Sequence, residues 1–202
     1  MDFLIDGPKS AKRTFIFAHG AGGAMDTPWM TRVARGLAEE GIRVVRFEFP
    51  YMAARRTGGK RGAPDREPVL LDAWREAVAA QGDPKETAIG GKSMGGRMAS
   101  MVADELEVAA LVCFGYPFHP PGQPAKTRTA HLKSLETRTL ILQGERDMFG
   151  TRDDVKGYEL SKRVQIEWLP DGDHSFKPRA SSGVTEGENL GRAVASAAKF
   201  LR

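Results

Sequence analysis

One serine in this chain, Ser93, stands in a pattern that can make a hydroxyl nucleophilic. It lies in Gly91-Lys92-Ser93-Met94-Gly95, between a short apolar β-compatible stretch (residues 87–90) and a run with helical periodicity (residues 96–105). A sharp turn from strand to helix strains the serine backbone and excludes bulky side chains two residues before and after it. The glycines at both ends of the pattern meet this need. Ser93 is therefore the candidate nucleophile, although a glycine–serine loop without chemistry would show the same five residues.

A serine hydroxyl is a poor nucleophile until a base takes its proton, so a histidine should accompany Ser93. The chain has four histidines: His19, His119, His131 and His174. Only His174 lies in a loop after the last predicted strand, downstream of every candidate acid. We therefore predict His174 as the base.

The base needs a carboxylate that fixes its tautomer and stabilises its cation. Asp147 is the candidate, because it closes Gln143-Gly144-Glu145-Arg146-Asp147, directly after a predicted strand. Asp153, Asp154 and Asp173 remain alternative acids. The order Ser93, Asp147, His174 is the order in which α/β-hydrolases carry their catalytic residues.

Attack on a carbonyl creates an oxyanion, which backbone N–H groups can stabilise. One candidate donor is the amide of Met94, the residue after the nucleophile, at the positive end of a predicted helix. The other lies in the loop His19-Gly20-Ala21-Gly22-Gly23. There Ala21 is the preferred donor and Gly22 the alternative, since the glycines let the backbone approach a substrate closely. His19 itself is expected to orient this loop.

The periodicity of apolar residues predicts the elements that position these side chains. Strands are predicted at residues 14–18, 42–47, 87–90, 108–114, 139–143 and 165–169, and helices after Thr27, after Pro68, and at residues 96–105, 152–160 and 188–201. The N-terminal segment is either an edge strand or a tail. Alternation of strands and helices predicts an α/β fold, with a mostly parallel central sheet covered by helices on both faces. Ligands of such sheets bind beyond the carboxyl ends of the strands.

Length and composition limit the possible architectures. The chain has 202 residues, of which 41% are hydrophobic, so we expect a single domain over residues 1–202. The connection at residues 115–135 is the longest candidate for a cap, and it is too short to be an independent domain. The longest strictly apolar run, residues 108–114, is far below the roughly 18 residues that span a bilayer.

The N-terminus and the cysteine content suggest a compartment. The first residues carry acids where a secretory signal has a basic start, so we expect a cytoplasmic protein that does not bind membranes. Cys113 is the only cysteine, which rules out an intramolecular disulfide. No residues have the spacing of a zinc site, and no cofactor is expected.

The net charge of +4 is spread along the chain with acids interspersed. One basic patch runs from Arg55 to Arg66, without aromatic residues for base stacking. It is either a solvated loop or an anion-binding or lid segment near the active site. We expect a small-molecule acyl substrate and no nucleic-acid partner, while the sequence leaves the oligomeric state undetermined.

The sequence resembles the α/β-hydrolase superfamily over nearly its whole length. Within it, the chain is similar to a compact, capless group that includes dienelactone-hydrolase-like proteins and the hydrolase-like domain of the NSL chromatin-complex subunit and testis-expressed relatives. The matching segments are His19-Gly20-Ala21-Gly22-Gly23, Phe49-Pro50-Tyr51 with Arg55-Arg56, Leu71-Asp72-Ala73-Trp74-Arg75, Gly91-Lys92-Ser93-Met94-Gly95-Gly96, Gly115-Tyr116-Pro117 with His119-Pro120-Pro121-Gly122, Gln143-Gly144-Glu145-Arg146-Asp147 with Phe149-Gly150, and Asp173-His174-Ser175-Phe176.

The resemblance implies the capless fold, the serine hydrolase apparatus, and the roles of Asp147 and His174. Dienelactone hydrolases proper carry a cysteine nucleophile, and the serine at position 93 argues against dienelactone hydrolysis itself. Our hypothesis is a carboxylic-ester hydrolase with an acyl-Ser93 intermediate and a shallow site suited to small or extended acyl groups. The alternatives are a thioesterase or peptidase with the same residues, and a non-catalytic interaction module.

Overall fold

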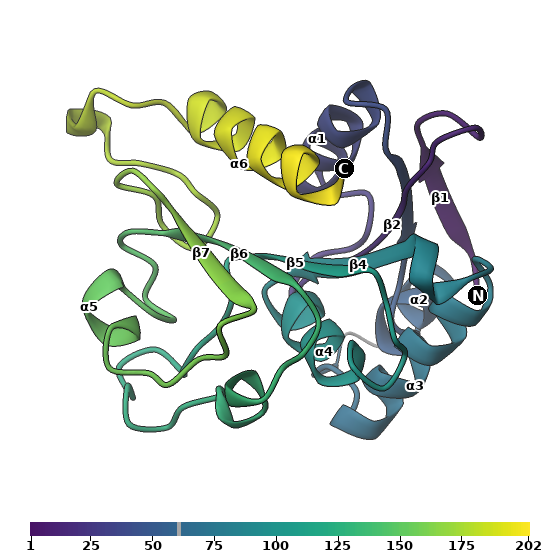
Figure 1. The fold of residues 1–202 in the computed structure, drawn as a ribbon, viewed down its shortest axis with the longest axis horizontal. Coiled ribbons are helices and arrows are strands. Elements are labelled where there is room, and N and C mark those ends of the chain that lie inside the picture. The colour runs from purple at the N-terminus through teal and green to yellow at the C-terminus, as the bar shows by residue number, and fades with distance from the viewer. Residues whose placement is uncertain (60–61) are drawn as a thin grey trace.

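A seven-stranded sheet forms the centre of the molecule. The computed structural model describes residues 1–59 and 62–202, and its strands lie in the order β1-β3-β2-β4-β5-β6-β7 (Figure 1). β1 is antiparallel to β3, and all other neighbouring strands are parallel. The strands are β1 (Phe3–Asp6), β2 (Thr14–Ala18), β3 (Arg43–Phe47), β4 (Thr87–Lys92), β5 (Ala110–Phe114), β6 (Thr139–Gly144) and β7 (Val164–Leu169).

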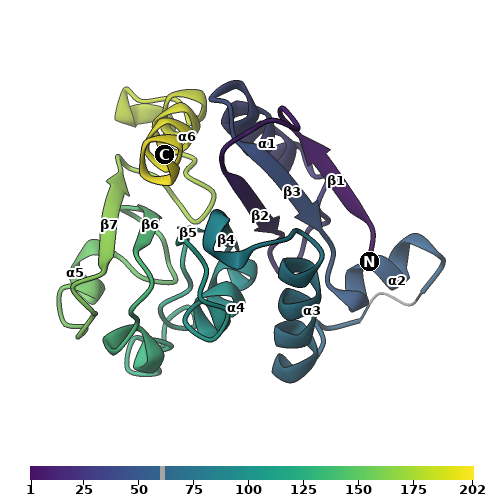
Figure 2. The same ribbon diagram turned by 45° about the vertical axis from the view of Figure 1, so that its right-hand side comes forward.

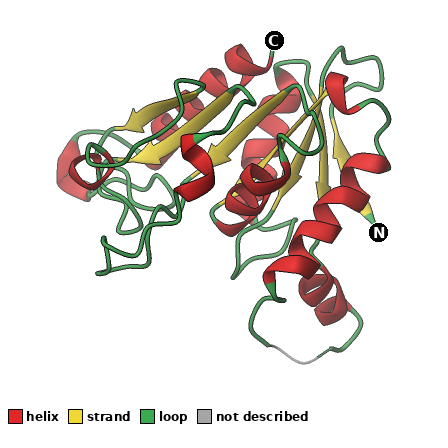
Figure 3. Cartoon of the chain, turned by 60° about the horizontal axis from the view of Figure 1, so that its bottom comes forward, coloured by secondary structure: helices red, strands yellow, loops and turns green. Residues whose placement is uncertain are grey.

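Helices cover both faces of this sheet, as the sequence predicted. α1 and α6 lie on one face and α3 and α4 on the other, with α2 beside α3 (Figures 1 and 2). Figure 3 shows the same layers by secondary structure, with helices on either side of the strands. The helices are α1 (Pro28–Glu39), α2 (Pro50–Arg56), α3 (Glu67–Ala79), α4 (Met94–Val102), α5 (Arg152–Val155) and α6 (Glu186–Leu201), with 3₁₀ turns at Pro84–Glu86, Ala130–Lys133 and Ala180–Ser182.

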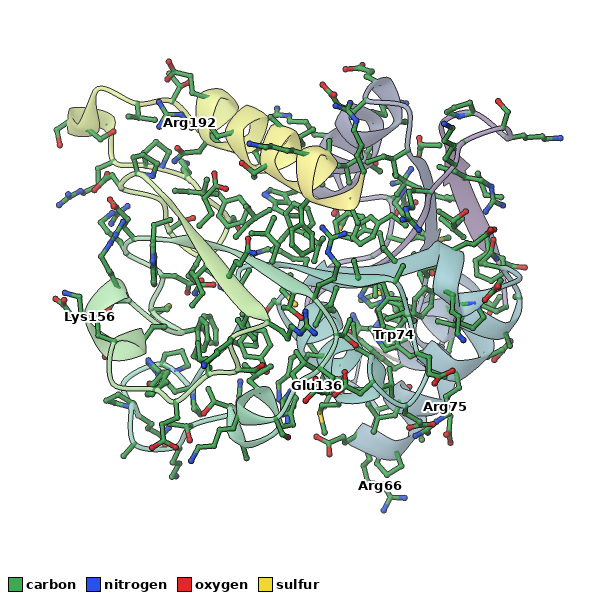
Figure 4. The ribbon with its side chains drawn as sticks, in the orientation of Figure 1. Arg66, Trp74, Arg75, Glu136, Lys156 and Arg192 are labelled. Carbon is green, nitrogen blue, oxygen red and sulfur yellow. The ribbon has the colours of Figure 1, made fainter. Side chains whose placement is uncertain are left out.

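The core is split by the sheet into two apolar clusters. β5 is buried along its whole length, because helices cover both of its faces. On the side of α3 and α4, Trp74 is fully buried with its ring 4.9 Å from that of Phe47, whereas Arg66 points outward (Figure 4). On the side of α1 and α6, Phe17 lies 5.3 Å from Phe114. Apolar side chains packed on both faces hold the sheet in place, and the ends of its strands are held in place with it.

Two sequence predictions need correction or completion. The N-terminal segment is an edge strand, β1, rather than a tail. Part of the predicted basic loop is helix α2, because Pro50 supplies the backbone angle of a first helical residue. The arginines Arg55 and Arg56 stand in its last turn, where cations are favourable. Residues 60 and 61 of the basic patch lie outside the described residues.

The helices around the site also differ in their bounds from the prediction. α5 ends at Val155 instead of residue 160, since Gly157 follows closely and glycine is a poor helix former. α4 begins at Met94, directly after the candidate nucleophile. The positive end of α4 therefore lies at Ser93 itself.

Within the described residues, the structure has neither a membrane-spanning helix nor a cluster of potential metal ligands. No helix there has the length and apolar character needed to cross a membrane. The same residues contain no group of three or more potential metal ligands.

Candidate active site

Ser93 occupies a strained turn between β4 and α4. Its φ of 50° and ψ of −115° lie outside the regions that residues with side chains favour. A Cβ added at Gly91 would lie 2.7 Å from the carbonyl oxygen of Ala18, and one at Gly95 would lie 2.5 Å from that of His19. Both glycines are therefore required by close backbone packing, as the sequence pattern predicted. Such strain costs about 1–3 kcal/mol and persists where the surroundings enforce it.

The structure brings the hydroxyl of Ser93, the imidazole of His174 and the carboxylate of Asp147 into one hydrogen-bonded chain. His174 Nε2 lies 2.8 Å from Ser93 Oγ, and His174 Nδ1 lies 2.7 Å from Asp147 Oδ2. The three residues follow β4, β6 and β7, at the carboxyl ends of three parallel strands on the same edge of the sheet. The topology therefore juxtaposes residues that are 81 and 27 positions apart.

The carboxylate of Asp147 is held by two other groups besides His174. Its side chain is fully buried, Oδ2 also accepts from Gln143 Nε2 at 2.9 Å, and Oδ1 accepts from the Phe149 N–H at 2.9 Å. An ionised carboxylate only accepts hydrogen bonds. In the short contact between His174 Nδ1 and Asp147 Oδ2, Nδ1 is therefore the donor, and the imidazole proton is assigned to it. Nε2 is then free to accept the proton of Ser93.

The alternative acids are occupied elsewhere. Asp153 forms an exposed pair with Lys156. Asp154 accepts from Thr151 in the cap of α5 and faces His119, whose Nε2 lies 3.4 Å away. Asp173 accepts from backbone amides of its own loop, at residues 175 and 177. Among the described contacts, only Asp147 pairs with His174.

The surroundings of His174 favour its neutral form. Burial is the main cause that lowers the pKa of this imidazole, and the charge of Lys92 lowers it further. The hydrogen bond to Asp147 raises the pKa of His174, but this effect is smaller than the effects that lower it. The Phe149 ring packs on the imidazole, with ring centres 4.3 Å apart. A neutral imidazole at pH 7 is the form that can accept a proton.

His19 holds the glycine loop that precedes α1. Its Nε2 accepts from the N–H of Phe49 at 3.1 Å, so its Nδ1 carries the proton and donates to the carbonyl of Gly20 at 2.7 Å. His19 is fully buried and makes no contact with Ser93 among the hydrogen bonds of the described residues. It therefore orients the loop, as the sequence analysis expected.

Tyr51 is a second support of this loop, and the sequence analysis assigned it no role. Its hydroxyl donates to the carbonyl of Ala21 at 2.8 Å and lies 3.4 Å from that of Gly20. In a trans peptide the N–H points away from the C=O, so the amides of Ala21 and Gly22 are turned away from Tyr51. A Cβ on Gly20 would lie 3.6 Å from the Ser93 Cβ, which places the loop against the nucleophile turn.

The predicted oxyanion donors, the amides of Met94 and of Ala21 or Gly22, belong to segments that lie beside Ser93. Met94 is the first residue of α4, so its N–H has no acceptor within the helix. Together with an amide from Ala21 or Gly22, it can donate to an oxygen bound at Ser93. Burial raises the pKa of Tyr51 to about 12, so its phenol remains a donor at neutral pH.

We expect Tyr51→Phe to lower kcat roughly 3- to 10-fold, with a smaller change in KM, since one hydrogen bond of about 0.5–1.5 kcal/mol holds the loop carbonyl. The rate of turnover at saturating substrate measures this effect. Tyr158→Phe is the matched control, because its hydroxyl donates to the Pro124 carbonyl at 3.2 Å, in another loop. An unchanged kcat in Tyr51→Phe would contradict the role of this phenol.

A cavity of about 340 Å³ opens beside Ser93 and His174. Trp29 forms part of its wall and is fixed by a hydrogen bond from its indole N–H to the Ser175 carbonyl at 3.1 Å. The remaining lining residues of the cavity are Gly20, Ala21, Gly22, Gly23, Thr27, Met30, Lys92 and Phe149.

The remaining histidines have other partners. His131 Nε2 lies 2.8 Å from Ser100 Oγ, and His119 Nδ1 lies 2.8 Å from the Pro120 carbonyl. The sequence analysis also missed the part played by Gln143, which anchors Asp147. The sequence did contain a sign of this role, because Gln143 places a polar side chain at the end of a buried strand. A buried amide needs hydrogen-bond partners.

Comparison with known proteins supports the fold. A serine hydrolase homologue from Coxiella burnetii superposes with a TM-score of 0.69 at 23% identity, covering 98% of this chain and 88% of the other. A serine hydrolase without lid from Xanthomonas campestris gives 0.67 at 24% identity, covering 99% and 85%. The dienelactone hydrolase of Anabaena variabilis gives 0.68 at 21% identity, covering 98% and 89%.

At these identities the structural neighbours support the fold alone. The sequence profile described as "Alpha/beta hydrolase domain" goes further, because it matches residues 11–202. Nearly the whole chain is thus accounted for by one family. The chain belongs to the alpha/beta hydrolase domain family.

Proposed function

We propose that this hydrolase cleaves carboxylic esters through an acyl-Ser93 intermediate. The observation that carries the proposal is the hydrogen-bonded chain from Ser93 through His174 to Asp147, at the carboxyl edge of the sheet. The match to the alpha/beta hydrolase family over residues 11–202 supports hydrolytic chemistry. A cavity of about 340 Å³ suits a small acyl or alcohol group.

The reaction begins when Ser93 Oγ attacks the ester carbonyl and its proton passes to Nε2 of His174. Asp147 stabilises the imidazolium, and the amides of Met94 and Ala21 donate to the oxyanion. Collapse breaks the bond to the alcohol, which leaves with the proton from His174. Water then gives a proton to His174 and attacks the acyl carbon, and Ser93 leaves as the hydroxyl.

A fluorophosphonate probe tests the proposal, because it reacts with serines activated in this way. We expect one adduct, located at Ser93 by peptide mass spectrometry. Absence of labelling on folded protein would instead favour a non-catalytic interaction module. A panel of esters, thioesters and aminopeptide substrates of matched acyl groups then separates the esterase from a thioesterase or peptidase.

The pH profile should reflect the lowered pKa of His174. Because the neutral imidazole is the active base, kcat/KM rises as pH increases through this pKa and then levels off. Burial places the pKa below the ordinary value of 6.5, so we expect the acid limb to lie below pH 6.5. Initial rates between pH 4.5 and 8 at constant ionic strength measure this limb. A midpoint above pH 7 would contradict the environment described for His174.

A further inference from the structure

Lys92 places a buried ammonium group at the candidate active site, and the mechanism above does not use it. Lys92 is the last residue of β4, directly before Ser93, and it lines the cavity of about 340 Å³. Its Nζ donates to the carbonyl oxygen of His174. It also lies 5.1 Å from the centre of the Trp29 ring and 5.7 Å from that of Phe176.

The charge of this ammonium is not balanced by a direct partner. Among the ion pairs of the described residues, none includes Lys92, and its hydrogen bonds there end at one carbonyl. An ammonium has three donors, so two remain for a ligand. A cation removed from water is costly unless an anion or acceptors compensate it. Aromatic faces offset part of this cost, but they do not supply a negative charge.

We propose that Lys92 binds a carboxylate of the substrate, and that the preferred esters carry this carboxylate a few bonds from the ester carbonyl. The inference rests on the proposed function, because it assigns the substrate class of the same site. Nζ of Lys92 is held by its hydrogen bond to the carbonyl of His174, and the imidazole of the same residue contacts Ser93 Oγ, so the cation is kept near the nucleophile. An anion held at Nζ therefore positions the ester carbonyl for attack.

The lining of the cavity favours a carboxylate over a phosphate group. A phosphate monoester carries a charge of about −1.5 to −2 and three strong acceptors, and it is usually met by several donors. Here one lysine provides the charge, beside the apolar surfaces of Trp29, Met30 and Phe149. A short chain of methylene groups ending in one carboxylate matches both features.

Two pairs of esters test the proposal, each with equal chain length in its anionic and neutral members. Monomethyl glutarate and methyl pentanoate place the carboxylate on the acyl side, and 4-acetoxybutanoate and butyl acetate place it on the alcohol side. We expect at least one anionic ester to have a kcat/KM more than 10-fold above its neutral partner. In Lys92→Met this ratio should fall at least 10-fold.

The measurement is the ratio of kcat/KM for the anionic ester to kcat/KM for its neutral partner, taken within one enzyme. This ratio is used because Lys92→Met can also disturb His174 through the lost hydrogen bond, which would affect both esters. Lys177→Met is the matched control: it removes the same charge from an exposed side chain three residues beyond His174. It should keep the wild-type ratio. Equal ratios in wild type and Lys92→Met for both pairs would overturn the proposal.

Binding separates this proposal from the proposed function. Titration calorimetry of 4-acetoxybutanoate and monomethyl glutarate into Ser93→Ala measures affinity without turnover. We expect one of them to bind, and the affinity to fall at least 10-fold in Ser93→Ala/Lys92→Met. If fluorophosphonate labelling fails but this pattern holds, the esterase proposal is wrong and the carboxylate site stands. If neither ester binds to Ser93→Ala, the carboxylate site is wrong.

The pH dependence of the ratio gives a further readout. Burial lowers the pKa of Lys92 to about 8, against the charges of Asp147 and Asp173. His174, the other titratable group beside it, is neutral above pH 7. Lys92 therefore loses its proton, and with it its charge, as pH rises through about 8. The pH dependence of kcat/KM reflects the ionisation of groups in the free enzyme, and Lys92 is one of them. We expect the preference for the anionic ester to decline between pH 7 and 9.5, and a constant preference would count against Lys92.

Discussion

Ser93→Ala is expected to abolish fluorophosphonate labelling and to lower kcat by a factor on the order of 10⁶. The hydroxyl is the only group at the turn that can form the acyl intermediate, and His174 Nε2 lies 2.8 Å from it. The oxyanion donors and the cavity remain in the variant, so a residual rate above that in water is expected. Initial rates on a short-chain ester and mass spectrometry of the labelled protein measure both effects.

Ser100→Ala is the matched control for this experiment. Ser100 is a buried serine of the neighbouring helix α4, and it contacts His131 instead of His174. It should keep the adduct at position 93. Activity of Ser93→Ala above about 1% of wild type would mean that another group performs the attack.

Asp147→Asn is expected to lower kcat by about 10⁴, by analogy with the effect of the same change in a serine protease. The neutral amide no longer stabilises the imidazolium that forms when His174 takes the serine proton. The variant should also be less stable by about 1–3 kcal/mol, because one buried hydrogen bond is lost. The amide must turn its NH₂ either toward the Phe149 N–H or toward Gln143 Nε2, and both are donors.

Two other aspartates provide the comparison. Asp153→Asn changes an exposed carboxylate paired with Lys156, and it should leave kcat within about 2-fold, as expected for a surface substitution. Asp173→Asn alters the loop of His174 without touching its ring, and its effect on kcat should be far smaller than that of Asp147→Asn. Thermal unfolding of each variant separates lost chemistry from lost structure. If Asp147→Asn is nearly silent and Asp173→Asn is not, the acid is misassigned.

The nucleophile turn could be predicted because its requirements are local. Gly91 and Gly95 are needed by backbone contacts of 2.7 and 2.5 Å, and no other residue type fits there. The order of strands and helices followed from apolar periodicity, and the strand-end rule then selected Asp147 and His174. These inferences depend on short stretches of sequence and on a general rule of parallel sheets.

Other parts of the site depend on contacts between distant segments. The hydroxyl of Tyr51 donates to the carbonyl of Ala21, which lies 30 residues away in the sequence. The residues around Tyr51 show no pattern from which this contact could be predicted. The environment of Lys92 is likewise set by Trp29 and Phe176, which come from other elements. The pairing of β1 with β3 also reflects tertiary context. Periodicity predicts elements, and it does not predict which side chains meet between them.

The division of the site between two halves of the chain has a consequence for engineering. Ser93 and the glycine loop come before the exposed segment at residues 121–127, whereas Asp147 and His174 come after it. The halves join through the parallel pairing of β5 with β6, and Arg202 at the C-terminus reaches back to Glu40. A molecule divided in this segment would carry an inactive part of the machinery in each piece. Turnover would then report reassembly, as in a split-reporter complementation assay.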